Sequence, residues 1–165
     1  MALNIPNHTP GTNGLRPEIC DHANVLVFDA ENRILILEDY GRGSAWGSWR
    51  IISCSLAHEE DPLTAVKHTL LAQTGLWAAD WIYLGSYVLD DIRQIGISHF
   101  FCARNIGSTN SNGSNSSHAH KIKWARGHEI REALLDGRIA IIHHAAAITL
   151  SLVMCDRMQF NRHKT

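Results

Sequence analysis

The segment from Asp61 to Gly75 carries the clearest local structural signal in the chain. Asp61 belongs to the residue types that cap helix N-termini, and Pro62 suits the first helical position. Gly75 is the residue type that most often ends a helix. Between them, apolar side chains recur at helical spacing, at Leu63, Val66, Leu70 and Leu71. We therefore expect a helix that begins at Pro62 and stops at Gly75.

Short β-rich runs surround this helix. Residues 23–29 and 34–39 predict a hairpin, and residues 48–52 predict a short strand after the glycine-rich stretch 40–47. Further strands are expected at 81–89, 96–104 and 121–126, followed by helices at 128–135 and 142–158. This order favours an α/β (α+β) fold in which a mixed β-sheet is sandwiched between helices.

Composition indicates one ordinary globular domain over residues 17–158, because 45% of the residues are hydrophobic and 19% are charged. We expect a flexible arm at 1–16, a flexible Ser/Asn-rich loop at 107–118 and a tail at 159–165. A net charge of −1 gives no general attraction to nucleic acid or to a membrane surface. The four cysteines are widely spaced and no signal peptide is visible, which favours reduced thiols in the cytoplasm.

Residues 49–76 resemble the Nudix signature, G-x5-E-x7-R-E-U-x-E-E-x-G-U, in which U is a bulky apolar residue. With Gly75 and Leu76 on the final G-U, Glu60 falls on the first glutamate and Cys54 on the opening glycine. The remaining signature positions are altered: His68 stands for the arginine, and Thr69, Ala72 and Gln73 stand for the other three glutamates.

The resemblance extends over roughly residues 22–152. Trp49 begins a segment similar to the W-E-L-P-A-G of the ADP-ribose pyrophosphatase type, and Glu60–Leu63 matches its E-D-P-L. Residues 81–87, 123–124 and 127–137 resemble later elements of that family. The resemblance implies a Nudix fold and an ancestry among enzymes that cleave nucleoside diphosphate derivatives.

In an active member, carboxylates at i, i+3 and i+4 on one helix face hold Mg²⁺, which prefers oxygen ligands. That ion neutralises the diphosphate and activates the attacking water. Thr69, Ala72 and Gln73 occupy this spacing without any negative charge. We therefore expect impaired or absent catalysis, with no cofactor.

Other ligand sets remain as hypotheses. Glu60, with Glu59, His58 and His68 nearby, is the position of the signature (the Nudix box) that still offers a metal ligand. Helix capping and solvation also account for these residues. If Glu60 binds a metal, the expected cofactor is Mg²⁺ or Mn²⁺, or a transition metal such as zinc. His118, His120 and His128 form a weaker candidate cluster.

Two further expectations concern the cleft. Cys54 is expected to be a buried inert thiol, since a nucleophile would need a base such as His58. In place of a glycine, its β-carbon is also expected to reshape the loop at about 1–2 kcal/mol. Arg42 could meet a phosphate and Trp46 could stack on a base, whereas Trp49 is expected to be a core residue.

Three functions follow as alternatives. The first is a module that binds a nucleotide-like small molecule or a protein partner without turnover. The second is an active hydrolase of a nucleoside diphosphate derivative with a non-standard ligand set built around Glu60 and nearby histidines. The third is a structural protein, and since the family often forms dimers, a homodimer belongs to this alternative.

Overall fold

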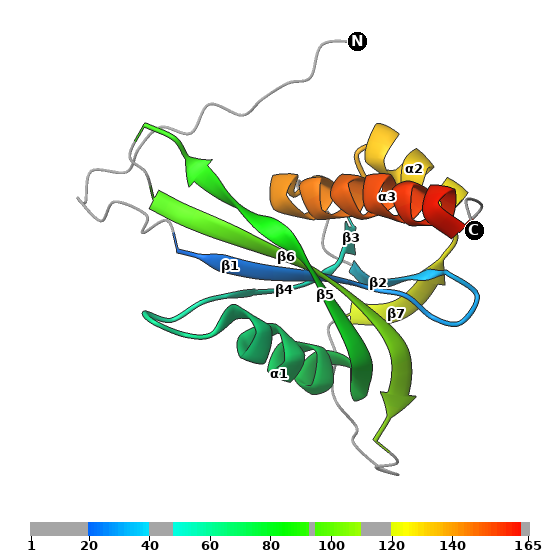
Figure 1. Ribbon diagram of the computed structural model, residues 1–165, viewed down its shortest axis with the longest axis horizontal. Coiled ribbons are helices and arrows are strands. Elements are labelled where there is room, and N and C mark those ends of the chain that lie inside the picture. The colour runs from blue at the N-terminus through cyan, green and yellow to red at the C-terminus, as the bar shows by residue number, and fades with distance from the viewer. Residues whose placement is uncertain (1–19, 40–47, 93–94, 110–119, 163–165) are drawn as a thin grey trace.

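The computed structural model describes residues 20–39, 48–92, 95–109 and 120–162, which form two β-sheets and three helices (Figure 1). The four-stranded sheet has the order β4-β1-β6-β5, and the three-stranded sheet has the order β3-β2-β7. The elements are β1 (His22–Val27), β2 (Ile34–Asp39), β3 (Trp49–Arg50), β4 (Ile52–Ser55), α1 (Pro62–Thr74), β5 (Leu76–Asp90), β6 (Ile95–Ser108), β7 (His120–Ala125), α2 (Gly127–Leu135) and α3 (Ile142–Arg162).

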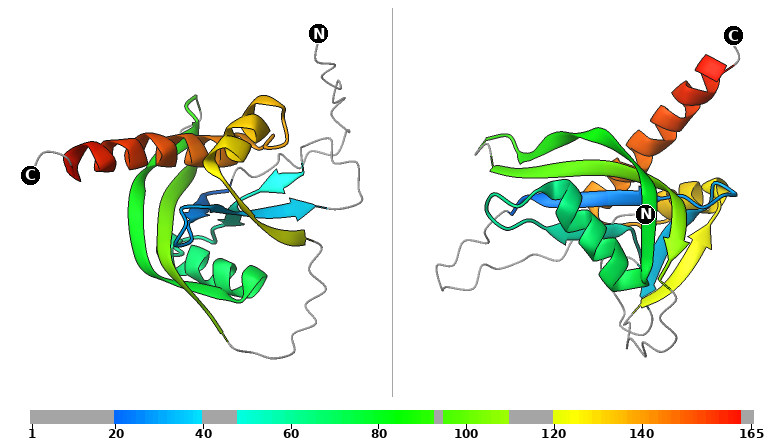
Figure 2. Two further views of the ribbon diagram at one scale, coloured as in Figure 1. Left: turned by 90° about the vertical axis from the view of Figure 1, so that its right-hand side faces the viewer. Right: turned by 60° about the horizontal axis from the view of Figure 1, so that its bottom comes forward.

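Helices cover the sheets from two sides. In Figures 1 and 2, α1 lies on one side and α2 and α3 lie on the other. Strands β1 and β6 are parallel, whereas the remaining pairs in both sheets are antiparallel. The predicted α+β architecture, with a mixed sheet between helices, is confirmed. The predicted strands at 81–89 and 96–104 are longer in the structure, and β6 includes Gly107 and Ser108 of the predicted loop.

The predicted hairpin of β1 and β2 is wrong, because the two strands belong to different sheets and share only the bridge Phe28–Ile34. Both edges of β1 are occupied, by β4 on one side and β6 on the other, so β2 pairs with β3 and β7 instead. The predicted strand at 48–52 is likewise split at Ile51 into β3 and β4. The chain therefore passes between the two sheets at both places.

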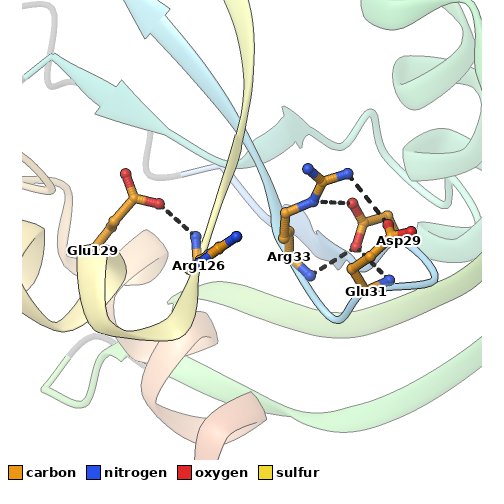
Figure 3. A network of polar contacts seen from close by, with 5 residues as sticks. All are labelled: Asp29, Glu31, Arg33, Arg126 and Glu129. Carbon is orange, nitrogen blue, oxygen red and sulfur yellow. Dashed lines mark hydrogen bonds and ion pairs between the residues drawn. The ribbon is translucent and has the colours of Figure 1, made fainter.

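The turn between β1 and β2 is organised by the Asp29 carboxylate (Figure 3). One oxygen accepts the backbone N–H of Glu31 at 3.0 Å and of Arg33 at 2.7 Å, and the other accepts the Arg33 Nε–H at 2.6 Å. Burial acts to raise the pKa of Asp29, but the bonds from Arg33 outweigh it and lower the pKa. The turn is thus fixed by local bonds, independently of strand pairing.

Helix α1 begins and ends as predicted. The Asp61 carboxylate accepts the backbone N–H of Thr64 at 2.8 Å, and Gly75 has a left-handed φ of 69° with its N–H on the Leu71 carbonyl at 2.8 Å. A β-carbon at such a φ is strained, which explains a glycine there. The helix buries Val66 and Leu70 completely, against a core cluster contributed by both sheets.

Replacing Asp61 with alanine is expected to lower the free energy of unfolding by about 1 kcal/mol, since the first helical turn loses its side-chain acceptor. Asp61→Asn is the matched control, because an amide oxygen still accepts the Thr64 N–H. Urea denaturation of both variants measures the difference. Equal stability of the alanine variant and the unmodified protein would show that the cap contributes nothing.

Among the described parts of the chain, no helix combines the length and apolar character that a membrane span requires.

Candidate functional site

A cavity of about 230 Å³ lies where α1 meets the strands β1, β3 and β4 and the start of α3. Its polar lining comes from six elements, α1, α3, β1, β3, β4 and β7, and includes two serines and Cys54 of β4. We call it the histidine cavity, and it is defined by Arg50, Gln73, His22, His120, His143 and His144. Strand pairing and helix docking therefore assemble it from residues up to 122 positions apart (144 − 22).

The three neutral box positions lie along α1, but they do different things. Thr69 is partly buried, and its hydroxyl donates to the Ala65 carbonyl at 2.9 Å. Ala72 is exposed and offers no ligand atom. Gln73 lines the histidine cavity, where its Oε1 is buried and has no hydrogen-bond partner. Of the three, only Gln73 presents an unengaged polar group to the cavity.

The remaining box residues, Glu60 and His68, do not line the histidine cavity. Glu60 is exposed, and its carboxylate accepts the Ala57 N–H at 2.8 Å just before α1. His68 is exposed on the helix, and His58 faces Glu59 at 3.9 Å in solvent. Within the described residues, no group of three or more His, Cys, Asp or Glu side chains has an arrangement that could hold a metal ion.

Cys54 lies in β4 opposite Ala23, and its backbone φ is not positive. The strain expected from its β-carbon is therefore absent, because the position is ordinary extended strand. The left-handed backbone of this connection is instead at Glu59, with φ 61°. Burial raises the pKa of the Cys54 thiol, and its Sγ–H donates to the Ala23 carbonyl at 3.9 Å. A raised pKa suits an inert thiol rather than a nucleophile.

Arg50 is the cationic centre of the cavity. Its Nη2 donates to the Asp39 carboxylate at 3.1 Å and lies 2.8 Å from His120 Nε2. His120 also contacts the Asp39 carboxylate. The Arg50 Nε is buried without a partner. Sequence reasoning missed Arg50, although it stands where the similar segment W-E-L-P-A-G carries its glutamate; that charge reversal was the available signal.

Three further imidazoles line the cavity. The His22 and His143 rings are stacked with centroids 5.0 Å apart, and the His143 and His144 rings meet edge-on at 4.8 Å. His144 is only 3% exposed. Burial lowers its pKa to about 3, with further lowering by the charges of His143, Arg50 and His22. Burial, and then His22, also lowers the pKa of His143. Both imidazoles are therefore neutral at pH 7.

The low pKa of His144 predicts loss of stability in mild acid. The folded protein keeps this imidazole neutral while the unfolded chain protonates it near pH 6.5, so its contribution is present above pH 6.5 and declines toward pH 3. The expected slope is at most about 1.4 kcal/mol per pH unit. Urea denaturation between pH 7 and 5 should give a smaller slope for His144→Gln. An identical slope in the variant would contradict the assignment.

Several predicted site residues lie elsewhere. Arg42, Trp46 and His118 fall outside the described residues. His128 is exposed on α2, away from the cavity lining. Trp49 is 2% exposed and lies in the core, as predicted, with its indole N–H donating to Glu38 at 3.1 Å.

A second cavity, of about 660 Å³, surrounds the turn between β1 and β2. Its size suits a small-molecule ligand. Its cations are engaged, however: Arg33 binds Asp29, and Arg104 donates to Asn32 at 3.1 Å. None of the buried unpartnered side-chain atoms in the described residues belongs to its lining. The histidine cavity is therefore the stronger candidate.

Comparison with solved structures supports the Nudix fold. The chain resembles an ADP compounds hydrolase with a TM-score of 0.63 and 12% identity, over 83% of this chain and 74% of the other. It also resembles a MutT structure, from work on Aliivibrio salmonicida and Vibrio cholerae, with a TM-score of 0.55 and 12% identity over 79% and 95%. No family model and no curated protein matches the sequence. At this identity, the likeness establishes the fold.

Proposed function

We propose that this chain is a Nudix-fold protein that binds a nucleotide-like ligand in the inherited cleft and does not cleave it by the metal-dependent route. The ligand class follows from the fold, whose solved neighbours include a hydrolase of ADP compounds. The loss of turnover follows from the side chains of α1. No cofactor is required for binding, and a nucleotide-like small molecule is the proposed partner.

The proposal rests on the side chains at the three altered signature positions of α1. At positions 69, 72 and 73, one hydroxyl is committed to the helix backbone, one side chain is a methyl group and one is an amide. Mg²⁺ requires a near-octahedral set of oxygens, usually with carboxylates among them. A single neutral amide at Gln73 does not supply that set.

The energetic consequence is large. A catalytic metal lowers the barrier by several kcal/mol, and each ~1.4 kcal/mol corresponds to a tenfold change in rate. Its loss therefore costs at least about 10³-fold in turnover. Binding suffers less, because the cleft is still present and its lining contains a cationic side chain, Arg50.

The alternative of an active enzyme would place the metal on Glu60. That carboxylate already accepts a backbone N–H at the start of α1, and it lies outside the lining of the histidine cavity. Turnover through Glu60 would therefore need a rearrangement of the Ala57–Asp61 turn.

Isothermal titration with ADP-ribose, beside an assay for released AMP, separates the alternatives. The proposal predicts saturable binding in EDTA and no Mg²⁺-dependent AMP formation. Turnover that requires Mg²⁺ and falls in Glu60→Gln would establish the active alternative. Absence of both binding and turnover would favour a structural or dimer-forming role. A variant of exposed Glu132 on α2, Glu132→Gln, is the control for loss of one surface carboxylate.

A further inference from the structure

The histidine cavity has a lining of unusual charge for its position in the fold. One arginine and four histidines line it, and among the described residues of the lining there is no aspartate or glutamate. Asp39, which is not part of the lining, binds Arg50 and His120. The fixed charge of Arg50 and the lack of carboxylates in this lining disfavour a hard divalent cation and favour an anion or another strong hydrogen-bond acceptor.

Unpartnered polar atoms are concentrated in this cavity. The described residues contain four buried side-chain N or O atoms without a partner, and three of them belong to Arg50, Gln73 and His144. Burying a polar group without a hydrogen bond costs free energy, so clustered unpartnered groups point to a guest. His144 is 97% buried (100 − 3), which leaves the cavity as the place for its partner.

The chemistry of these atoms selects the guest. The Arg50 Nε–H can only donate, so its partner must be an acceptor. Gln73 and His144 can adapt, because an amide can turn its N–H₂ group inward and an imidazole can change tautomer. Only an acceptor guest therefore satisfies all three side chains together. A bound cation would leave the Arg50 donor unpaired.

Two further features favour negative charge on that guest. The start of α3 lines the cavity through His143 and His144, with Ile141 just before the helix, and the N-terminus of a 21-residue helix favours anions. Burial is the largest cause of the lowered pKa of His144, and the positive charge of the nearby Arg50 contributes to it. An anion would relieve this positive potential.

The size of the cavity limits the guest to one oxyanion group. Pockets for whole drug-sized ligands measure roughly 300–1,000 Å³, whereas this one measures about 230 Å³. A single phosphoryl group and its waters fit that volume, and the rest of a nucleotide-like ligand would lie outside.

We propose that the histidine cavity is a metal-independent oxyanion pocket, in which Arg50, Gln73 and the histidines hold one phosphoryl group directly. The inference rests on the proposed function, and it names the part of the ligand that this site takes. The guanidinium and imidazole groups occupy the place of the divalent cation, so no metal bridges the phosphoryl group to α1.

The test is isothermal titration calorimetry of the 165-residue chain with inorganic phosphate in EDTA. We expect saturable binding, competition between phosphate and ADP-ribose, and no strengthening by Mg²⁺. Arg50→Gln should weaken phosphate binding by about 10- to 100-fold, the range for one charge-assisted hydrogen bond. The matched control Arg131→Gln, on the exposed face of α2, should bind as the unmodified protein does.

A second pair of variants tests the pocket without changing Arg50. His143→Gln should weaken phosphate binding, whereas His128→Gln, an exposed histidine of α2, should not. If Arg50→Gln does not fold because Asp39 loses its arginine partner, Asp39→Asn with Arg50→Gln removes both charges of the pair. That double variant should fold and bind phosphate weakly.

The outcomes separate the two proposals. ADP-ribose binding that neither phosphate nor Arg50→Gln affects would overturn the oxyanion pocket and leave the proposed function intact. Phosphate binding without ADP-ribose binding would support the pocket and overturn the proposed function. Phosphate binding only with Mg²⁺, or stoichiometric Zn²⁺ binding in place of phosphate, would overturn the pocket.

Discussion

Leu70→Ala is expected to lower the free energy of unfolding by about 2–5 kcal/mol, the usual cost of removing a fully buried leucine side chain. Leu70 is 0% exposed and packs in the cluster that joins α1 to both sheets. The alanine leaves a cavity that a helix held between capped ends closes only in part.

Leu71→Ala is the matched control, because the neighbouring leucine is 40% exposed on the same helix. Its expected cost is less than about 1 kcal/mol, since most of that side chain already faces water. Urea denaturation of both variants gives the comparison. Equal losses of unfolding free energy would mean that α1 packs against the sheets through a different face from the one in the structure.

Thr69→Glu, Ala72→Glu and Gln73→Glu together are expected to create a Mg²⁺ site on α1. The three carboxylates would stand at i, i+3 and i+4, where they project together from one helix face. Without metal, their mutual repulsion destabilises the helix by a few tenths of a kcal/mol per pair. Added Mg²⁺ should therefore raise the Tm of the triple variant and leave that of the unmodified protein unchanged.

The control carries Thr69→Gln and Ala72→Gln, which match the new side chains in size without their charge. Arg50 supplies a second check, because its guanidinium shares the cavity with position 73 and competes for the new carboxylate. Adding Arg50→Gln to the triple variant should strengthen Mg²⁺ binding. A Mg²⁺-dependent rise in Tm for the control or the unmodified protein would contradict our interpretation of the helix face.

Local signals in the sequence predicted the parts of the fold that local bonds determine. Helix α1 is fixed by Asp61 and Gly75, each acting within one turn, and its limits agree with the prediction. The hairpin prediction failed because strand partners are chosen over long distances: β1 pairs with β6, some 76 residues later, as in the match of His22 with Ser98 (98 − 22). The residue patterns of β1 and β2 do not reveal which distant strands will pair with them.

The candidate site was likewise predictable only in part. The neutral residues of the box could be seen in sequence because the helical spacing relates them. The histidine cavity could not, since His22 and His143 come from opposite ends of the chain and stack only after α3 docks beside β1. In sequence, His143 and His144 were two polar residues within an apolar helix, a pattern typical of a buried core segment.

The central claim is that no divalent cation is anchored on α1 while a phosphoryl group is held by Arg50 and the histidines. A crystal soaked with ADP-ribose and Mn²⁺, with anomalous diffraction recorded for manganese, tests it directly. We predict density for a phosphoryl group beside Arg50 and His144, and no anomalous peak near Glu60, Thr69 or Gln73. A manganese peak between α1 and the phosphoryl oxygens would contradict the claim.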